Sequence, residues 1–191
     1  MKIDSLPLFP LHTVLFPGGV LPLRIFECRY LDMVSDCLRN NHGFGVCLIR
    51  AGREAGAAAE SFDVGTLATI QDWDKSPDGL LAITVRGEQR FRVVSREVRS
   101  DLLTVAQVVL LEEPPAQRLP VEYAPLARLL DRLLDDLDPP FRDLPRVLDD
   151  SDWVGARLAE LLPLDPLDKQ VLLEQGEPMT RLAKLAERLR G

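Results

Sequence analysis

Prolines interrupt the most apolar stretch of the sequence, and this combination limits what the N-terminal part can form. The stretch LPLFPLHTVLFPGGVLPLRIFECRY runs from Leu6 to Tyr30 and contains four prolines. Proline has no backbone N–H, so within sheets it is confined to edges, first positions and bulges. We therefore expect short strands over 6–9, 13–16 and 20–26, separated by turns, instead of one long apolar element.

The same stretch does not fit a targeting segment. A signal peptide needs a basic start, an unbroken apolar run and a small-residue cleavage site, whereas Asp4, Pro7 and Pro10 interrupt this run. A membrane helix needs about 20 consecutive apolar residues, and no part of the sequence supplies them. We therefore expect a cytoplasmic protein with no membrane partner.

The composition is typical of a folded, acidic protein. Of 191 residues, 46% are hydrophobic and 28% charged, and the formal net charge is -7. A negative protein repels a phosphate backbone, so nucleic acid is an unlikely partner. The three cysteines, Cys28, Cys37 and Cys47, are odd in number and show no CxxC spacing. They predict free thiols in a reducing compartment.

The period of the apolar residues changes along the chain and predicts the order of the elements. Apolar residues recur with helical spacing from about 30 to 38. Between 43 and 111 the strand-like segments show alternation with a period of two residues, and helical spacing returns beyond the EEPP sequence at 112–115. The turn sequence SPDG at 76–79 predicts a hairpin, and the Gly/Ala-rich segment 51–60 predicts an exposed, mobile loop.

The change of period predicts two domains, a β domain over 1–115 and a helical domain over 116–191. The third of its four helices has a clear start, with Asp165 as N-cap and Pro166 in the first turn, and we expect Leu167 and Val171 to form its apolar side. The four helices are predicted at about 126–137, 153–162, from 166 onward, and 178–190.

Sequence motifs for catalysis are missing. The chain has no GxxxxGK[ST], GxGxxG, GxSxG or HExxH sequence, and it has only two histidines, His12 and His42. Asp72, Asp74 and Asp78 do not match the spacing of a calcium loop and are better explained by the hairpin turn. We therefore expect a non-enzymatic protein without a cofactor or a metal.

Several charged or aromatic groups are open to two interpretations. The acidic residues between Asp135 and Asp152 indicate a solvated surface or a cation site, and the first is favoured. The aromatic and apolar side chains Phe16, Leu21 and Trp73 belong to the core or anchor a polypeptide, and we name them as candidate peptide-binding residues. A basic strip is either solvent-facing alternation or a contact for an anionic partner; it consists of Arg86, Arg90, Arg92, Arg96 and Arg99.

The opening stretch resembles the start of the Lon protease N-terminal, or substrate-binding, domain family. That family reads L-P-L-F-P, then an apolar stretch with a Pro-Gly turn, then L-x-I-F-E-x-R-Y. The resemblance extends to the G-T, D-G and G-x-x-R-F sequences of the middle and to the helical end at 157–174. The motif residues predicted to have structural roles include Pro10, Pro17, Glu27, Arg29 and Tyr30, with Glu27 and Arg29 expected at the helix start in a surface pair.

The resemblance implies both a fold and a function. The fold is α+β: a PUA-like pseudo-β-barrel with an inserted helix, followed by a C-terminal helical bundle. The function is binding of unfolded or specific polypeptides, in substrate recognition or as an adaptor in proteolysis, with a Lon-type protease as a possible partner. The resemblance implies a stand-alone member without the ATPase and protease domains. The alternative is nucleic-acid binding through the PUA-like barrel.

Overall fold

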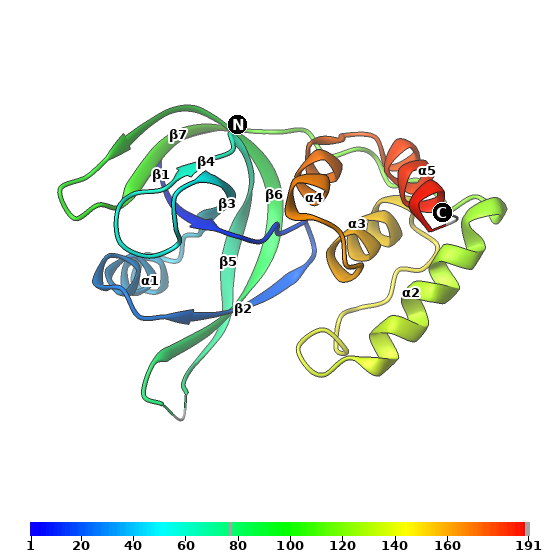
Figure 1. Ribbon diagram of the computed structural model, residues 1–191, viewed down its shortest axis with the longest axis horizontal. Coiled ribbons are helices and arrows are strands. Elements are labelled where there is room, and N and C mark those ends of the chain that lie inside the picture. Colours follow the sequence, from blue (N-terminus) through cyan, green and yellow to red (C-terminus); the bar gives the residue numbers. More distant parts are fainter. Residues whose placement is uncertain (77, 190–191) are drawn as a thin grey trace. The chain divides into compact units, whose positions relative to one another are not determined.

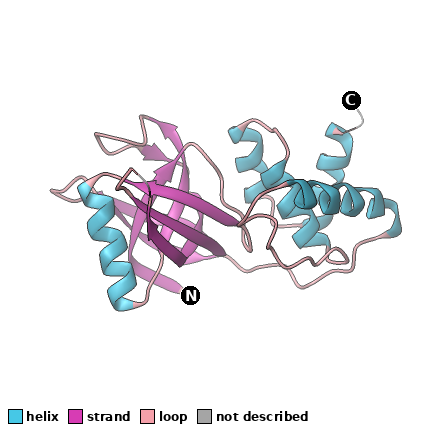
Figure 2. Cartoon of the chain, turned by 90° about the horizontal axis from the view of Figure 1, so that it is seen from below, coloured by secondary structure: helices cyan, strands magenta, loops and turns pink. Residues whose placement is uncertain are grey.

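Strands and helices separate along the chain, as the change of period predicts. The computed structural model describes residues 1–76 and 78–189, and it divides into two compact units, Met1–Glu112 and Glu113–Gly191. All named strands and helix α1 belong to the first unit, and the other α-helices belong to the second (Figure 1, Figure 2). The mixed fold class is confirmed. The PUA-like relationship, the helical bundle and the domain limits 1–115 and 116–191 remain predictions.

The strands of the first unit form one seven-stranded sheet that curves into a ring. The strand path is β1-β7-β6-β5-β3, and a parallel pairing of β1 with β3 joins its two ends. Strand β2 pairs with β6, and the short β4 pairs with β3. The elements are β1 (Lys2–Leu11), β2 (Val20–Ile25), α1 (Cys28–Asn40), β3 (Phe44–Ala51), β4 (Glu60–Ser61), β5 (Val64–Lys75), β6 (Leu81–Val98) and β7 (Thr104–Leu110).

The prolines do not break the opening stretch where the sequence predicts. Strand β1 continues through Pro7 and Pro10, because it pairs with β7 over its first part and with β3 over residues 8–11. A proline whose missing N–H points away from the paired side costs the ladder no hydrogen bond. The predicted strand over 13–16 is wrong: this segment is irregular, and its carbonyls accept from Thr66 Oγ1 and the Gly19 amide.

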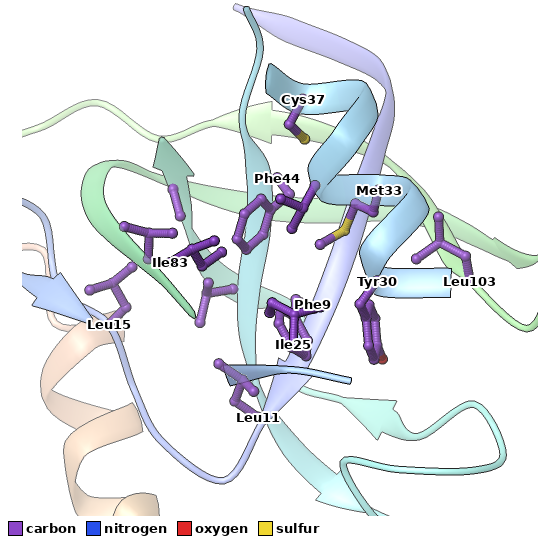
Figure 3. Close-up of a cluster of buried hydrophobic side chains, with 14 of the residues drawn as sticks. Phe9, Leu11, Leu15, Ile25, Tyr30, Met33, Cys37, Phe44, Ile83 and Leu103 are labelled. Carbon is purple, nitrogen blue, oxygen red and sulfur yellow. The ribbon is translucent and has the colours of Figure 1, made fainter. Parts of the chain in front are cut away.

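The core of the first unit lies between the ring and α1. Tyr30, Met33 and Cys37 of α1 point into it, beside Phe9, Phe44 and Ile83 of the strands (Figure 3). The helical spacing predicted for this segment is confirmed, and α1 ends at Asn41, whose left-handed φ of 52° allows the chain to turn toward β3.

The second unit is built around helix α3, which contacts the other three α-helices. Small residues such as Gly155, Ala156 and Ala159 are buried along α3 and permit this close approach. The helices are α2 (Ala124–Asp136), α3 (Ser151–Leu161), α4 (Pro166–Glu174) and α5 (Pro178–Arg188), preceded by the short 3-10 helix η1 (Val121–Tyr123).

Two features of the second unit differ from or extend the predictions. Leu167 and Val171 are exposed, whereas α4 buries Gln170, Leu172 and Leu173, so the predicted apolar side of this helix is wrong. The predicted N-cap is confirmed, since Asp165 accepts from the Leu167 amide at 2.8 Å.

The acidic residues of α2 have a structural partner. The Arg146 guanidinium pairs with both Asp131 and Asp135. It therefore offsets the unfavourable carboxylates near the C-terminal end of the helix dipole.

Two predicted positions lie outside the described residues: Pro77 of the hairpin turn and Arg190 at the predicted end of the last helix. Among the described residues of this turn, the Gly79 amide donates a hydrogen bond to the Ser76 carbonyl. Across residues 1–76 and 78–189, the helices are too short or too polar to cross a bilayer.

The burial of two cysteines makes a prediction about thiol reactivity. Burial raises the pKa of Cys37 to about 11 and that of Cys47 to about 12, whereas Cys28 is exposed. Because the thiolate is the reactive form, a disulfide reagent at pH 8 is expected to modify Cys28 rapidly and the other two only after unfolding. The absorbance of the chromophore that the reagent releases, measured with and without denaturant, gives the number of thiols that react in each state. Rapid native modification of all three thiols would contradict the packing described here.

Candidate functional site

An apolar pocket of about 310 Å³ opens in the first unit where β1, β2 and α1 meet. Its walls come from the ends of two strands, from the first turn of the helix and from the loop after β3. A pocket of this size accommodates one large side chain and lies at the lower limit of small-molecule sites. The lining residues are Phe9, Leu11, Pro22, Leu23, Arg24, Ile25, Phe26, Glu27, Tyr30 and Glu54.

Stacked aromatic rings form one wall of the pocket. The Phe9 and Tyr30 rings stack with centroids 4.1 Å apart, and Phe44 lies behind them, 6.0 Å from Phe9 (Figure 3). Burial raises the pKa of the Tyr30 phenol, the nearby Arg29 cation lowers it, and Glu27 and Glu54 raise it. With its pKa raised, the Tyr30 phenol is neutral near pH 7, so this ring adds no charge to the wall.

The Arg29 guanidinium packs against the Tyr30 ring of this wall. It lies 4.7 Å from the Tyr30 ring centroid, donates to the Leu102 carbonyl at 2.9 Å and pairs with Glu27 at 3.0 Å. The expected pairing of Glu27 with Arg29 is present, but its predicted surface position is wrong, because Arg29 is only 6% exposed. The guanidinium packs on Tyr30 and bonds to the turn between β6 and β7, and these contacts keep it in the interior.

The loop over residues 51–60 closes another side of the pocket. Glu54 accepts from the His12 amide at 2.6 Å, and the Gly56 amide donates to Glu27 at 3.2 Å. At the base of the loop, Arg50 pairs with Glu60. The loop is exposed, as predicted, and these bonds attach it to the pocket.

Strand β2 presents a backbone edge to the pocket that is poorly suited to pairing. The Gly87 amide donates to the Gly19 carbonyl at 2.9 Å, and bonded pairs recur at every second residue of an antiparallel ladder. Leu21 and Leu23 therefore bond to β6, and Pro22 faces away from it. Because Pro22 has no N–H, this edge cannot donate at its centre. At Pro22 the edge offers a ligand only a carbonyl, so side chains supply most of the contacts that we expect in the pocket.

Phe26 gives the pocket an exposed apolar rim. It follows the inward-facing Ile25, so it falls on the outward phase of β2, and it is 59% exposed at the junction with α1. Because Phe26 adjoins an apolar cavity, it enlarges the contiguous apolar surface that a ligand can contact.

A second cavity, of about 320 Å³, lies on the other side of Arg29, and some of its charged side chains pair with one another. His42 Nε2 lies 3.1 Å from Asp36, and Arg99 lies 3.5 Å from Asp101. These two pairs compensate part of the charge on the cavity wall.

The predicted peptide-binding residues are not brought together. Phe16 is fully buried and Leu21 packs against the core, which removes the ring of Phe16 from any surface contact in this structure. Trp73 is 61% exposed on β5. Among the described residues, the pocket lining includes none of these three. The pocket residue Phe26 was missed, although its position out of phase with Leu23 and Ile25 is a signal that the sequence contains.

The remaining motif residues and the arginine strip have local partners. Pro10 is buried opposite Cys47, and Pro17 is half-buried before the Gly18 turn. Arg96 pairs with Asp63 and donates to the Ser61 carbonyl, so the strip is not a continuous basic surface. Within 1–76 and 78–189 no cluster of three or more His, Cys, Asp or Glu side chains could hold a metal.

Comparison with known proteins gives consistent matches to one family. The family model described as the ATP-dependent protease La (LON) substrate-binding domain matches residues 5–191. The crystal structure of a Lon N-terminal domain protein from Xanthomonas campestris is 43% identical, covers 97% of this chain and 98% of its own, and superposes with a TM-score of 0.78. The N-terminal domain of a Mycobacterium avium complex Lon protease is 19% identical over 96% of this chain and 97% of its own, with a TM-score of 0.62, and supports the fold alone.

Among curated proteins, the Lon protease of Anaeromyxobacter dehalogenans is 26% identical over 96% of this chain. The chain spans about a quarter of the length of such relatives, 23% in this case.

The bond between Glu54 and the His12 amide predicts how the loop is held. In Glu54→Ala, the His12 amide loses its acceptor, so its hydrogen exchange is expected to accelerate about fivefold, as for loss of one ordinary hydrogen bond. Amide exchange followed by NMR measures this. Arg53→Ala removes a neighbouring charged side chain without touching the bond and should leave the rate unchanged. An unaltered His12 rate in Glu54→Ala would show that the loop is held by other contacts.

Proposed function

Because the chain belongs to the substrate-binding domain family of the ATP-dependent protease La (Lon), we propose that it binds unfolded or specific polypeptides through the apolar pocket. In this proposal an apolar side chain of the client enters between Phe9, Leu23 and Tyr30, and Phe26 covers it from the rim. The single observation that supports the proposal most directly is this pocket, already formed and bordered by an exposed phenylalanine.

The chemistry of the pocket fits an unfolded client. Unfolded chains expose the aliphatic and aromatic side chains that folded proteins bury. The charged groups at the rim are of both signs, Arg24 with Glu27 and Glu54, so they impose little selection on the residues that flank the bound side chain. Such a site favours apolar residues in many sequence contexts.

The proposal has further parts that follow from the family resemblance. The chain acts without catalysis, in substrate recognition or as an adaptor in proteolysis, and a Lon-type protease in the cytoplasm is its partner. Its organisation is a PUA-like barrel over 1–115, which contains the pocket, and a helical bundle over 116–191.

A polypeptide titration tests the proposed pocket. Reduced and carboxymethylated α-lactalbumin, which cannot refold, is added to the labelled protein while backbone amide shifts are recorded. Saturable shifts are expected at β2, at the start of α1 and in the loop 51–60. Phe26→Ser should weaken binding about tenfold, because truncating an anchor residue costs more than 1 kcal/mol, and it should not unfold the protein, since this side chain is already largely exposed.

The matched control is Val121→Ser. Val121 is 89% exposed and lies in the second unit, so this variant also removes an exposed apolar side chain but leaves the pocket intact. It should bind like the unaltered protein. Equal affinity of the Phe26→Ser and unaltered proteins would overturn the assignment of the pocket. Saturable binding of a short RNA instead of the polypeptide would favour the nucleic-acid alternative.

A further inference from the structure

Strand β5 has an open backbone edge next to an exposed tryptophan. Its pairing with β3 covers only Thr66, Leu67 and Ala68. Beyond these residues, β6 is the strand that pairs with β5 in the described sheet. Strand β2 pairs with the opposite edge of β6, so it does not cover this edge of β5 (Figure 1).

The hydrogen-bond pattern identifies which amides face outward. The Ser76 amide donates to the Leu80 carbonyl at 2.9 Å, and bonded pairs alternate along an antiparallel ladder. Asp74 and Asp72, which lie opposite Ala82 and Thr84, therefore bond to β6. Trp73 and Lys75 direct their backbone N–H and C=O groups away from β6, into the open edge.

Neighbouring carboxylates occupy these two outward amides. Asp72 Oδ1 accepts from the Trp73 amide at 2.9 Å, and Asp74 Oδ1 accepts from the Lys75 amide at 2.6 Å. All four side chains are exposed. This protection differs from that of β2, where Pro22 removes a donor permanently. A side chain can rotate away, and a carbonyl of an incoming strand can then take its place.

The two faces of β5 call for different side chains on an added strand. Alternate residues point to opposite faces, so Asp72 and Asp74 share one face and Trp73 lies on the other. Once displaced from the amides, the two carboxylates are best paired with cations, and the indole surface is best covered by an apolar side chain. The net charge of -7 also attracts a basic segment.

We propose that the β5 edge at Trp73–Lys75 binds an extended basic segment of a polypeptide by strand addition, and that the segment alternates lysine or arginine with apolar residues. The cations lie beside Asp72 and Asp74, the apolar residues lie against Trp73, and the backbone replaces the carboxylates at the two amides. This inference concerns a different edge from the apolar pocket and does not depend on it.

The test uses the full chain in a Trp153→Phe background, which leaves Trp73 as the single tryptophan. The probe is the capped peptide Lys-Val-Lys-Val-Lys-Val-Lys-Val, and binding is read from Trp73 fluorescence and from backbone amide shifts. A saturable blue shift is expected, with amide shifts at β5. A peptide of the same composition in two blocks, lysines then valines, and the Glu-Val analogue should bind at least tenfold more weakly, because neither satisfies both faces of one strand.

Two matched variants separate strand addition from simple charge attraction. Lys75→Pro removes the lysine charge together with an outward N–H that β6 does not use, whereas Lys75→Gln makes the same charge change but keeps that N–H. Both remove a positive charge, so charge attraction alone predicts that both bind the basic peptide more tightly. Strand addition predicts that Lys75→Pro binds at least tenfold more weakly than Lys75→Gln. Equal binding by the two would overturn the proposal.

The acidic face has its own test. In Asp72→Asn combined with Asp74→Asn, amide oxygens can still accept from the two backbone amides, but the charges are lost. Binding of the alternating peptide should weaken about fivefold, as expected for two cross-strand ion pairs. Unchanged affinity would exclude the basic specificity. Phe26→Ser should leave this binding intact, so the failure of one site can be told from the failure of the other.

Discussion

The buried guanidinium of Arg29 connects the parts of the first unit that form the pocket. It bonds to the Leu102 carbonyl in the turn between β6 and β7, pairs with Glu27 and lies under the Tyr30 ring. Glu27 in turn accepts from the Gly56 amide. One planar, permanently charged group therefore holds helix and turn directly, and the loop through Glu27. A lysine could not make these contacts together, because its single ammonium group lacks both the flat surface and the divergent donors.

The prolines show where sequence patterns stop predicting structure. Their number in the opening stretch correctly predicts a strand-rich start without a long helix, but not that β1 continues through Pro7 and Pro10. A proline is tolerated when its missing N–H faces an unpaired side, and which side is paired depends on β3 and β7, which lie far away in the sequence. In contrast, the N-cap of α4 depends on adjacent residues and was predicted correctly from Asp165.

The candidate site was predictable only in part for the same reason. The sequence identifies the segment that contains the pocket, and Tyr30 and Glu27 belong to its motif. It does not show which aromatic residues are exposed. Phe16 lies in an irregular segment with consecutive buried residues and is enclosed, whereas Phe26 lies out of phase at a strand end and projects outward. Burial of Phe16 is decided by the tertiary path of the chain, which local periodicity does not encode.

The carboxylates of this acidic protein are used mainly to satisfy its own backbone and arginines. Asp150 and Asp165 cap helices, Asp152 pairs with Arg181 at 2.6 Å, and Asp72 and Asp74 occupy edge amides of β5. A cap at a helix start satisfies a donor that has no other partner in the fold. An edge amide is different, because a second strand can satisfy it equally well. The same type of bond is therefore structural at the helices and exchangeable at the β5 edge, which is why the edge, and not the acidic segment around α2, is the place to expect a partner.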